Sequence, residues 1–153
     1  MQKLQILNTR EKKAIVDIIN KQWGCDFKTD LVMLKSSKDK LYLMTRDFER
    51  IETQRVRVDS MGNYFGMLTG TELRLSIEGS QMIGPQAKKN ILEIDHDNMR
   101  LWLKGKDLKM ELPEELSGFV ILKYKNDFLG TGKSRGDEIL NFIPKNRRIL
   151  AED

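Results

Sequence analysis

Cysteine and histidine are almost absent from the 153 residues, since each occurs only once. A single thiol, Cys25, excludes an internal disulfide and a metal site built from several thiolates, so we expect a reducing compartment. The one imidazole, His96, stands in "EIDHDN", without a second histidine or a cysteine beside it. We expect it to be a solvated turn residue, and we predict neither a bound metal nor a cofactor.

Long apolar runs are missing as well. No stretch approaches the ~20 residues that a membrane-spanning helix needs. The N-terminal "MQKLQILNTREKK" lacks the apolar region and cleavage site of a signal peptide. We therefore expect a cytoplasmic protein without a membrane partner.

The composition is 39% hydrophobic and 33% charged, which is typical of a soluble globular chain large enough to bury a core. A net charge of +4 permits an acidic partner such as nucleic acid without requiring one. The basic surplus lies mainly before residue 87, because acidic and basic residues nearly cancel after it. Net charge alone therefore locates no binding face.

The tripeptide "GKS" at residues 132–134 matches the end of a phosphate-binding P-loop, G-x-x-x-x-G-K-[ST]. The first glycine of that motif would stand at position 127, where Asp127 places a carboxylate of the wrong sign. A P-loop also opens a helix, and Pro144 interrupts the short segment that follows. We predict no nucleotide site. A small hydrolase using Lys133 and Asp127 is a weaker alternative, because the sequence offers no second acid–base group.

Hydrophobic periodicity predicts an α/β first half. A capping box at Asn8 and Glu11 begins a helix that Gly24 can end. Strands are expected at 30–35, 40–45 and 54–59, a short helix at 46–51, and strands with tight turns from 61 onward. A helix over 74–84 contains Gly79, which would allow close packing against another element. Gly84-Pro85 is the best boundary in the chain.

The second half has the texture of a small β-barrel. Strands are expected at 90–95 and 108–112, with a short helix between them that runs into a glycine. Two strands within 118–134 surround a turn at 125–127, and another strand spans 138–144. A basic tail, "KNRR", follows. Many short strands with one small helix favour a barrel.

These segments resemble a PUA domain, an RNA-binding module. The resemblance rests on "LWLKGKDL", on "GFVILKYKNDFLGTGK" and on "ILNFIPKNRR", which is similar to the C-terminal segment of Nop/Sun-family RNA cytosine-5 methyltransferases. The stretch "YFGMLTGTELRLSIEGSQMIGPQAKKNILEI" resembles the junction of a pre-PUA and a PUA domain, as in small archaeal ribosome-biogenesis proteins. The resemblance implies an α+β fold, with a mixed α/β pre-PUA domain over 1–86 packed on a PUA-like pseudo-barrel over 87–153.

The implied function is non-catalytic binding of structured RNA in rRNA or tRNA maturation or in ribosome biogenesis. The methyltransferase catalytic domain has no counterpart in the chain. An alternative is an adaptor for a protein partner, such as a separate RNA methyltransferase or pre-ribosomal proteins, with RNA contact secondary. The Met- and aromatic-rich "MGNYFGMLTG" would supply the surface for such a partner.

The resemblance places the RNA-facing surface near the glycine loop after the helix and near the last strands. Carried onto this sequence, the RNA-binding residues are Lys104, Gly105, Lys106, Lys133, Arg135, Lys145, Arg147 and Arg148. Lysine and arginine neutralise phosphates, and Gly130, Gly132 and Gly136 would let backbone N–H groups approach them closely.

Aromatic side chains provide a second route to RNA, by stacking on unpaired bases. Tyr124, Phe128 and Phe142 lie in apolar strands, where we expect core packing. Tyr64 and Phe65, beside glycines, are expected either to be exposed or to fill the domain interface. Arg74 is expected to face the groove between the domains.

Overall fold

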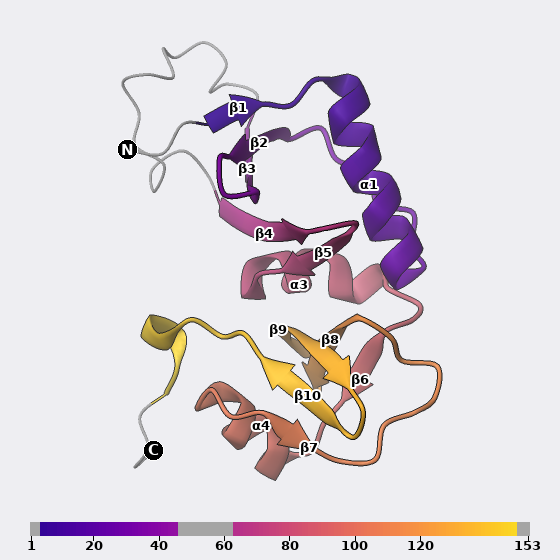
Figure 1. The fold of residues 1–153 in the computed structure, drawn as a ribbon, viewed down its shortest axis with the longest axis vertical. Helices are drawn as coiled ribbons and strands as arrows, with labels where there is room; N and C mark the ends of the chain where they lie inside the picture. Colours follow the sequence, from indigo (N-terminus) through magenta and orange to yellow (C-terminus); the bar gives the residue numbers. More distant parts are fainter. Residues whose placement is uncertain (1–3, 46–62, 150–153) are drawn as a thin grey trace.

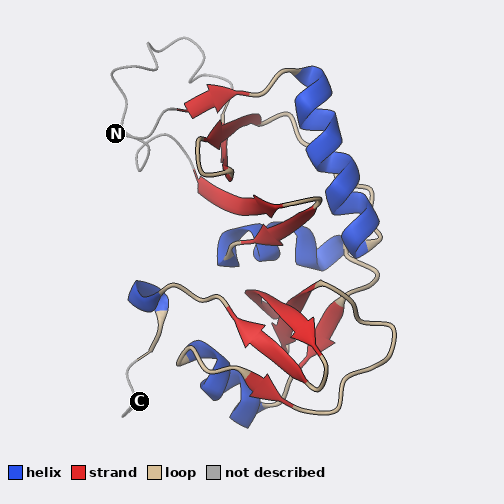
Figure 2. Cartoon of the chain, in the orientation of Figure 1, coloured by secondary structure: helices blue, strands red, loops and turns tan. Residues whose placement is uncertain are grey.

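The computed structural model describes residues 4–45 and 63–149 (Figure 1). The helix expected at 46–51 and the strand expected at 54–59 lie outside this range. The described part contains three α-helices and two five-stranded sheets, an α+β fold that confirms the predicted class (Figure 2). None of its helices has the length and apolar character needed to cross a membrane.

The first sheet is an antiparallel meander in which each strand pairs with the next along the chain. Its strands are β1 (Leu4–Ile6), β2 (Val32–Ser36), β3 (Lys40–Met44), β4 (Asn63–Thr69) and β5 (Glu72–Leu75). Tight turns explain the antiparallel pairs β2–β3 and β4–β5, whereas residues 7–31 separate β1 from β2 and residues 45–62 separate β3 from β4. The strands predicted at 30–35 and 40–45 are confirmed as β2 and β3.

Helix α1 (Thr9–Trp23) lies along the first sheet (Figure 1). Its predicted capping box is present: the backbone N–H of Glu11 donates to the Asn8 side chain, and the Asn8 N–H donates to the Glu11 carboxylate. Gly24 ends the helix with a φ of 61°, as predicted. The apolar stripe buries Ile15, Ile19 and Trp23 against the sheet.

Helix α3 (Ile77–Ile83) is shorter than the helix predicted over 74–84. Arg74 and Leu75 instead pair with β4, and Ser76 caps the helix by accepting the N–H of Gly79. Strand pairing to a neighbour already in place outweighs the local helical pattern at these two residues. Gly79 does allow close packing, because a Cβ there would lie 2.2 Å from the carbonyl oxygen of Phe65.

The second sheet has the order β6-β8-β9-β10-β7, with β6 and β8 parallel and the other pairs antiparallel. The strands are β6 (Ile91–Glu93), β7 (Leu108–Lys109), β8 (Phe119–Tyr124), β9 (Asp127–Arg135) and β10 (Glu138–Asn141), and α4 (His96–Leu103) packs beside them. The strands expected at 108–112 and 138–144 are therefore shorter than predicted. The arrangement agrees with a PUA-like pseudo-barrel.

The two sheets share buried apolar surface. Phe119 and Ile121 of β8 belong to the core that α1 and the first sheet enclose, while Trp102 and Leu122 belong to the core of the second sheet. The boundary proposed after residue 86 falls at the end of a 3-10 helix, Gly84–Gln86, which links the two halves. The division remains a prediction, and each half completes the packing of the other.

Candidate nucleic-acid interface

The "GKS" tripeptide lies within strand β9, and the next element is strand β10 rather than a helix. The Lys133 ammonium lies 3.6 Å from a carboxylate oxygen of Glu72 and 5.1 Å from the ring centre of Phe119. This surrounding is unlike a P-loop, in which the lysine contacts phosphates at the start of a helix. The prediction that the match is coincidental is confirmed.

Two of the glycines expected to approach phosphates are used internally, so that expectation is wrong for them. The Gly130 N–H donates to the Ser80 hydroxyl at 2.8 Å, which ties β9 to α3. A Cβ on Gly132 would lie 2.7 Å from the Trp102 ring, so this glycine makes room for the buried indole. Gly136, at the β9–β10 turn, has a φ of 61° and open space around it.

The loop after α4 has the geometry of a Schellman motif. The Gly105 N–H donates to the Trp102 carbonyl, and the Lys106 N–H donates to the Leu101 carbonyl. Gly105 has a φ of 89°, in the left-handed region that favours glycine. The chain therefore turns sharply here, with Lys104 on one side of the turn and Lys106 on the other.

The guanidinium of Arg148 lies directly over this loop. A Cβ on Gly105 would lie 2.3 Å from Arg148 Nε, so a larger residue here would displace the Arg148 side chain from its position over the loop. Arg148 Nε donates to the Ile143 carbonyl at 2.9 Å, and the Ile149 N–H donates to the Leu103 carbonyl at 3.0 Å. The Arg148 side chain is thus fixed within its own segment, and the Ile149 backbone ties that segment to the end of α4.

Asn141, which the sequence analysis did not single out, holds the loop and the tail in register. Its side-chain amide donates to the carbonyls of Trp102 and Lys106, at 2.8 and 2.9 Å. Its side-chain oxygen accepts the Ile143 N–H, and its own N–H donates to the Asp107 carboxylate. The sequence shows only that an asparagine ends an apolar strand, and this pattern does not identify the groups to which its side chain is hydrogen-bonded.

Four of the eight predicted RNA-binding residues, Lys104, Gly105, Lys106 and Arg148, lie at this loop, and Lys145 stands three residues before Arg148, whose N–H donates to the Lys145 carbonyl. We name the set the tail cluster: Lys104, Gly105, Lys106, Lys145 and Arg148. The three lysines have exposed or half-exposed side chains. Within residues 4–45 and 63–149, no carboxylate forms an ion pair with any of them. Their charges are free to attract an external anion.

The other three predicted residues each face a carboxylate of this chain. Lys133 pairs with Glu72 at 3.6 Å, Arg135 with Glu138 at 2.6 Å, and Arg147 with Glu78 at 2.6 Å. These pairs are partly exposed, so each contributes only about 0–1 kcal/mol and yields to a competing anion at small cost. They still reduce the local positive potential.

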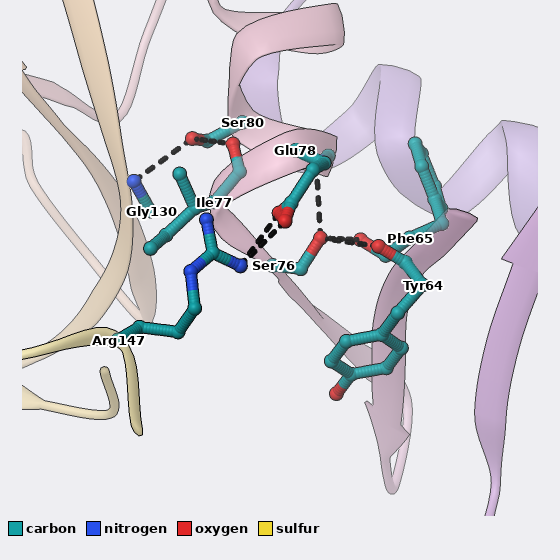
Figure 3. A network of polar contacts seen from close by, with 9 residues as sticks. Tyr64, Phe65, Ser76, Ile77, Glu78, Ser80, Gly130 and Arg147 are labelled. Carbon is teal, nitrogen blue, oxygen red and sulfur yellow. Dashed lines mark hydrogen bonds and ion pairs between the residues drawn. The ribbon is translucent and has the colours of Figure 1, made fainter. Parts of the chain in front are cut away.

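A pocket of about 80 Å³ opens between the two halves. Figure 3 shows part of its wall: Tyr64, Ser76, Ile77, Gly130 and Arg147, with Arg147 turned toward Glu78. We name it the groove pocket. The remaining lining residues are Arg74, Leu75, Thr131, Phe142, Ile143 and Pro144.

The predicted orientation of Arg74 toward this groove is confirmed, since its guanidinium carbon lies 4.5 Å from the ring centre of Phe142. Tyr64 is half-buried at the interface, whereas Phe65 is 2% exposed. The core packing expected of Phe142 and Phe128 is also present, because both pack against the first core.

The isolated histidine and cysteine form no site with other groups. His96 is exposed at the first position of α4, as expected for a solvated residue. Burial raises the pKa of the Cys25 thiol above its ordinary value. No group of three His, Cys, Asp or Glu side chains within the described residues has an arrangement that could hold a metal ion.

Comparison with known proteins matches the second sheet to one family. Residues 89–149 match the family model for the methyltransferase RsmF PUA domain. The range covers β6 through the basic tail, and therefore the whole tail cluster.

Three bacterial proteins named ribosomal RNA small subunit methyltransferase F are similar over a longer range. The Aeromonas salmonicida (strain A449) protein is 27% identical over 107 residues, 70% of this chain and 22% of that protein. The Shewanella sp. (strain MR-4) protein is 20% identical over 144 residues, which cover 91% of this chain and 30% of that protein. The Vibrio cholerae serotype O1 (strain M66-2) protein is 22% identical over 136 residues, which cover 89% of this chain and 28% of that protein.

The chain thus spans less than a third of the length of these relatives. The resemblance inferred from the glycine-bearing segments is confirmed: the second half of the chain is similar to the PUA domain of RsmF methyltransferases.

Proposed function

We propose that this protein binds structured RNA through the tail cluster and contributes to ribosomal RNA modification without performing the chemistry itself. The observation that carries the proposal is the glycine loop at Gly105, packed under Arg148 and flanked by Lys104 and Lys106. The family match supports it, because a PUA domain is the RNA-binding part of the methyltransferases it resembles. The name of those relatives points to small-subunit ribosomal RNA as the RNA to test first.

The geometry of the tail cluster suits an RNA backbone better than a base sequence. Three lysines carry point charges, and a lysine attracts phosphate without the two-pronged geometry that arginine offers. A-form RNA hides its base edges in a narrow major groove, so proteins grip it by phosphates, 2′-hydroxyls and shape. We therefore propose recognition of folded RNA with weak dependence on the bases of the helix.

Non-catalytic action is the second part of the proposal. The segment that matches the family model is the RNA-binding module of the relatives, not their methyl-transfer domain. The described residues supply no metal-binding group, and the lysine of "GKS" is paired with Glu72. A separate methyltransferase or a separate domain would then supply the chemistry.

The adaptor alternative has less support. Of the Met- and aromatic-rich stretch, Phe65 is buried and Tyr64 is half-buried at the groove pocket. The large exposed apolar side chains of the described residues are Ile6, Met82 and Leu101, which lie on β1, α3 and α4 respectively. Three separate elements do not make the continuous patch that marks a protein-binding surface.

Fluorescence anisotropy over a series of salt concentrations tests the proposal with a labelled hairpin from small-subunit ribosomal RNA. The test variant is Lys104→Ala/Lys106→Ala/Lys145→Ala. Each phosphate contact adds about one unit to the slope of log affinity against log salt, so removing three should reduce that slope by about three.

The matched control is Lys13→Ala/Lys21→Ala/Lys28→Ala, which removes the same charge from exposed positions on and after α1. The control should keep nearly the wild-type slope, because those lysines lie outside the tail cluster. An equal reduction of the salt slope in both variants would mean that RNA binding depends only on the net charge of the protein and not on the tail cluster. Absence of wild-type binding at low salt would refute RNA binding by this chain.

A further inference from the structure

The groove pocket is built from both halves of the chain. Strands β4 and β5 supply Tyr64 and Arg74, β9 supplies Thr131, and the segment after β10 supplies Phe142 and Arg147. At about 80 Å³ it is far below the ~300–1,000 Å³ of sites that enclose a drug-sized ligand. It has room for one planar group that enters from outside, not for a whole cofactor.

The serine and threonine hydroxyls on the pocket wall are already engaged within the protein. The Ser76 hydroxyl donates toward the carbonyls of Tyr64 and Phe65 (Figure 3), and the Thr131 hydroxyl donates to the Leu75 carbonyl at 2.9 Å. The groups that can still donate to a guest are the Tyr64 hydroxyl, which has no partner within the described residues, and the Arg74 guanidinium. The Arg147 guanidinium can do so once it leaves Glu78.

Arg74 is half-buried and has no carboxylate partner within the described part of the chain. Its guanidinium carbon lies 4.5 Å from the centre of the Phe142 ring, and its polar contact within the described residues is a 3.5 Å approach to the weak acceptor Met67 Sδ. An aromatic ring therefore supports one face of the guanidinium plane. Guanidinium planes and aromatic rings are the surfaces on which unpaired RNA bases stack.

The groove pocket and the tail cluster share one segment of chain. Ile143, Pro144 and Arg147 line the pocket, while Lys145 and Arg148 belong to the tail cluster. Since Lys145 stands between the pocket-lining residues Pro144 and Arg147, an RNA phosphate at this lysine lies close to the pocket lining. A base held inside a duplex cannot turn toward it, whereas a bulged base can.

We propose that the groove pocket binds a single unpaired base of the bound RNA, which stacks on the guanidinium of Arg74. The adjoining phosphate draws Arg147 from Glu78, since an exposed ion pair exchanges partners at little cost. The inference rests on the proposed RNA binding and adds the feature that the RNA must present. The tail cluster supplies affinity for the backbone, and the pocket supplies preference for a helix with an extruded nucleotide.

The test compares two labelled RNA hairpins that differ only by one bulged nucleotide in the stem. Wild type should bind the bulged hairpin about tenfold more tightly, the size of one base–side-chain stacking interaction. Arg74→Lys keeps the charge and loses the planar surface, so it should bind both hairpins equally and keep the salt dependence. Arg10→Lys, at an exposed position on α1, is the matched control and should keep the preference.

A direct measurement on wild type makes the result independent of how well a variant folds. With 2-aminopurine as the bulged base, binding should protect its fluorescence from collisional quenching by acrylamide. Wild type that binds both hairpins equally, leaves the base open to acrylamide, or keeps its preference after Arg74→Lys overturns the pocket proposal while RNA binding stands. Failure to bind either hairpin at low salt overturns the RNA-binding function, and the pocket proposal with it.

Discussion

The shared core of the two halves makes a quantitative prediction about Phe119. Although this residue belongs to β8 of the second sheet, its side chain is 4% exposed and packs in the core of the first half. Replacing Phe119 with Ala should therefore destabilise both halves together. If the two halves folded separately, the substitution would lower the stability of only one of them.

Truncating a buried phenylalanine to alanine costs about 3–5 kcal/mol of unfolding free energy, because it loses apolar contact and leaves a cavity. The Phe142 ring lies 6.1 Å from the Phe119 ring and the Lys133 ammonium lies 5.1 Å from it, so we expect the upper half of that range. With a urea dependence of about 2 kcal/mol per molar, the unfolding midpoint should fall by roughly 2 M.

Trp23 and Trp102 serve as reporters, since each is fully buried in a different core. Urea unfolding would be followed by fluorescence in Trp23→Phe and Trp102→Phe backgrounds, with and without Phe119→Ala. Both reporters should show the same shift relative to their own background. As a control, Leu101→Ala, at a 44% exposed position, should shift neither by much. If only one of the two tryptophan signals shifts, the halves unfold independently and the reasoning fails.

Three smaller predictions follow from local contacts. Asn8→Ala removes the capping box of α1 and should lower the unfolding free energy by about 1 kcal/mol in urea titration, whereas Asn8→Ser should nearly preserve it. Gly79→Ala should destabilise by about 1–3 kcal/mol despite the better helix propensity of alanine, because the new Cβ meets the Phe65 carbonyl; a stabilised variant would contradict that packing. Because burial raises the Cys25 pKa, its thiolate fraction at pH 8 should be low, and alkylation by iodoacetamide followed by mass spectrometry should be slower than that of a free cysteine.

Features that depend on neighbours in the chain were predictable from the sequence. The capping box, the end of α1 at Gly24 and the turn between β8 and β9 each depend on a few adjacent residues. The rejection of the P-loop was equally local, since Asp127 stands where the motif requires glycine. The glycine loop after α4 was also visible, because its residue types specify a helix end.

Pairing across the fold was not predictable. Arg74 and Leu75 look helical in sequence, yet they form β5 because β4 is there to pair with them. Gly130 and Gly132 look available to phosphate, yet one is bonded to Ser80 and the other lies under Trp102. The partners of Arg74 and Leu75 are in the preceding strand, Met67 and Gly66, whereas the partners of the two glycines lie in other elements far along the chain.

The sequence by itself determined the order of most elements, because helix and strand periodicity and turn chemistry are local; its resemblance to PUA domains supplied the α+β class and the choice of basic residues near the glycine loop. The tertiary structure decided which of those basic side chains form an ion pair with a carboxylate of the same chain. Lys133, Arg135 and Arg147 meet carboxylates of the chain, whereas the lysines of the tail cluster meet none in the described part. The charge of a side chain is a property of its residue, but its partner is set by folding, and Arg74 lies over Phe142 only because β5 packs near the segment that follows β10.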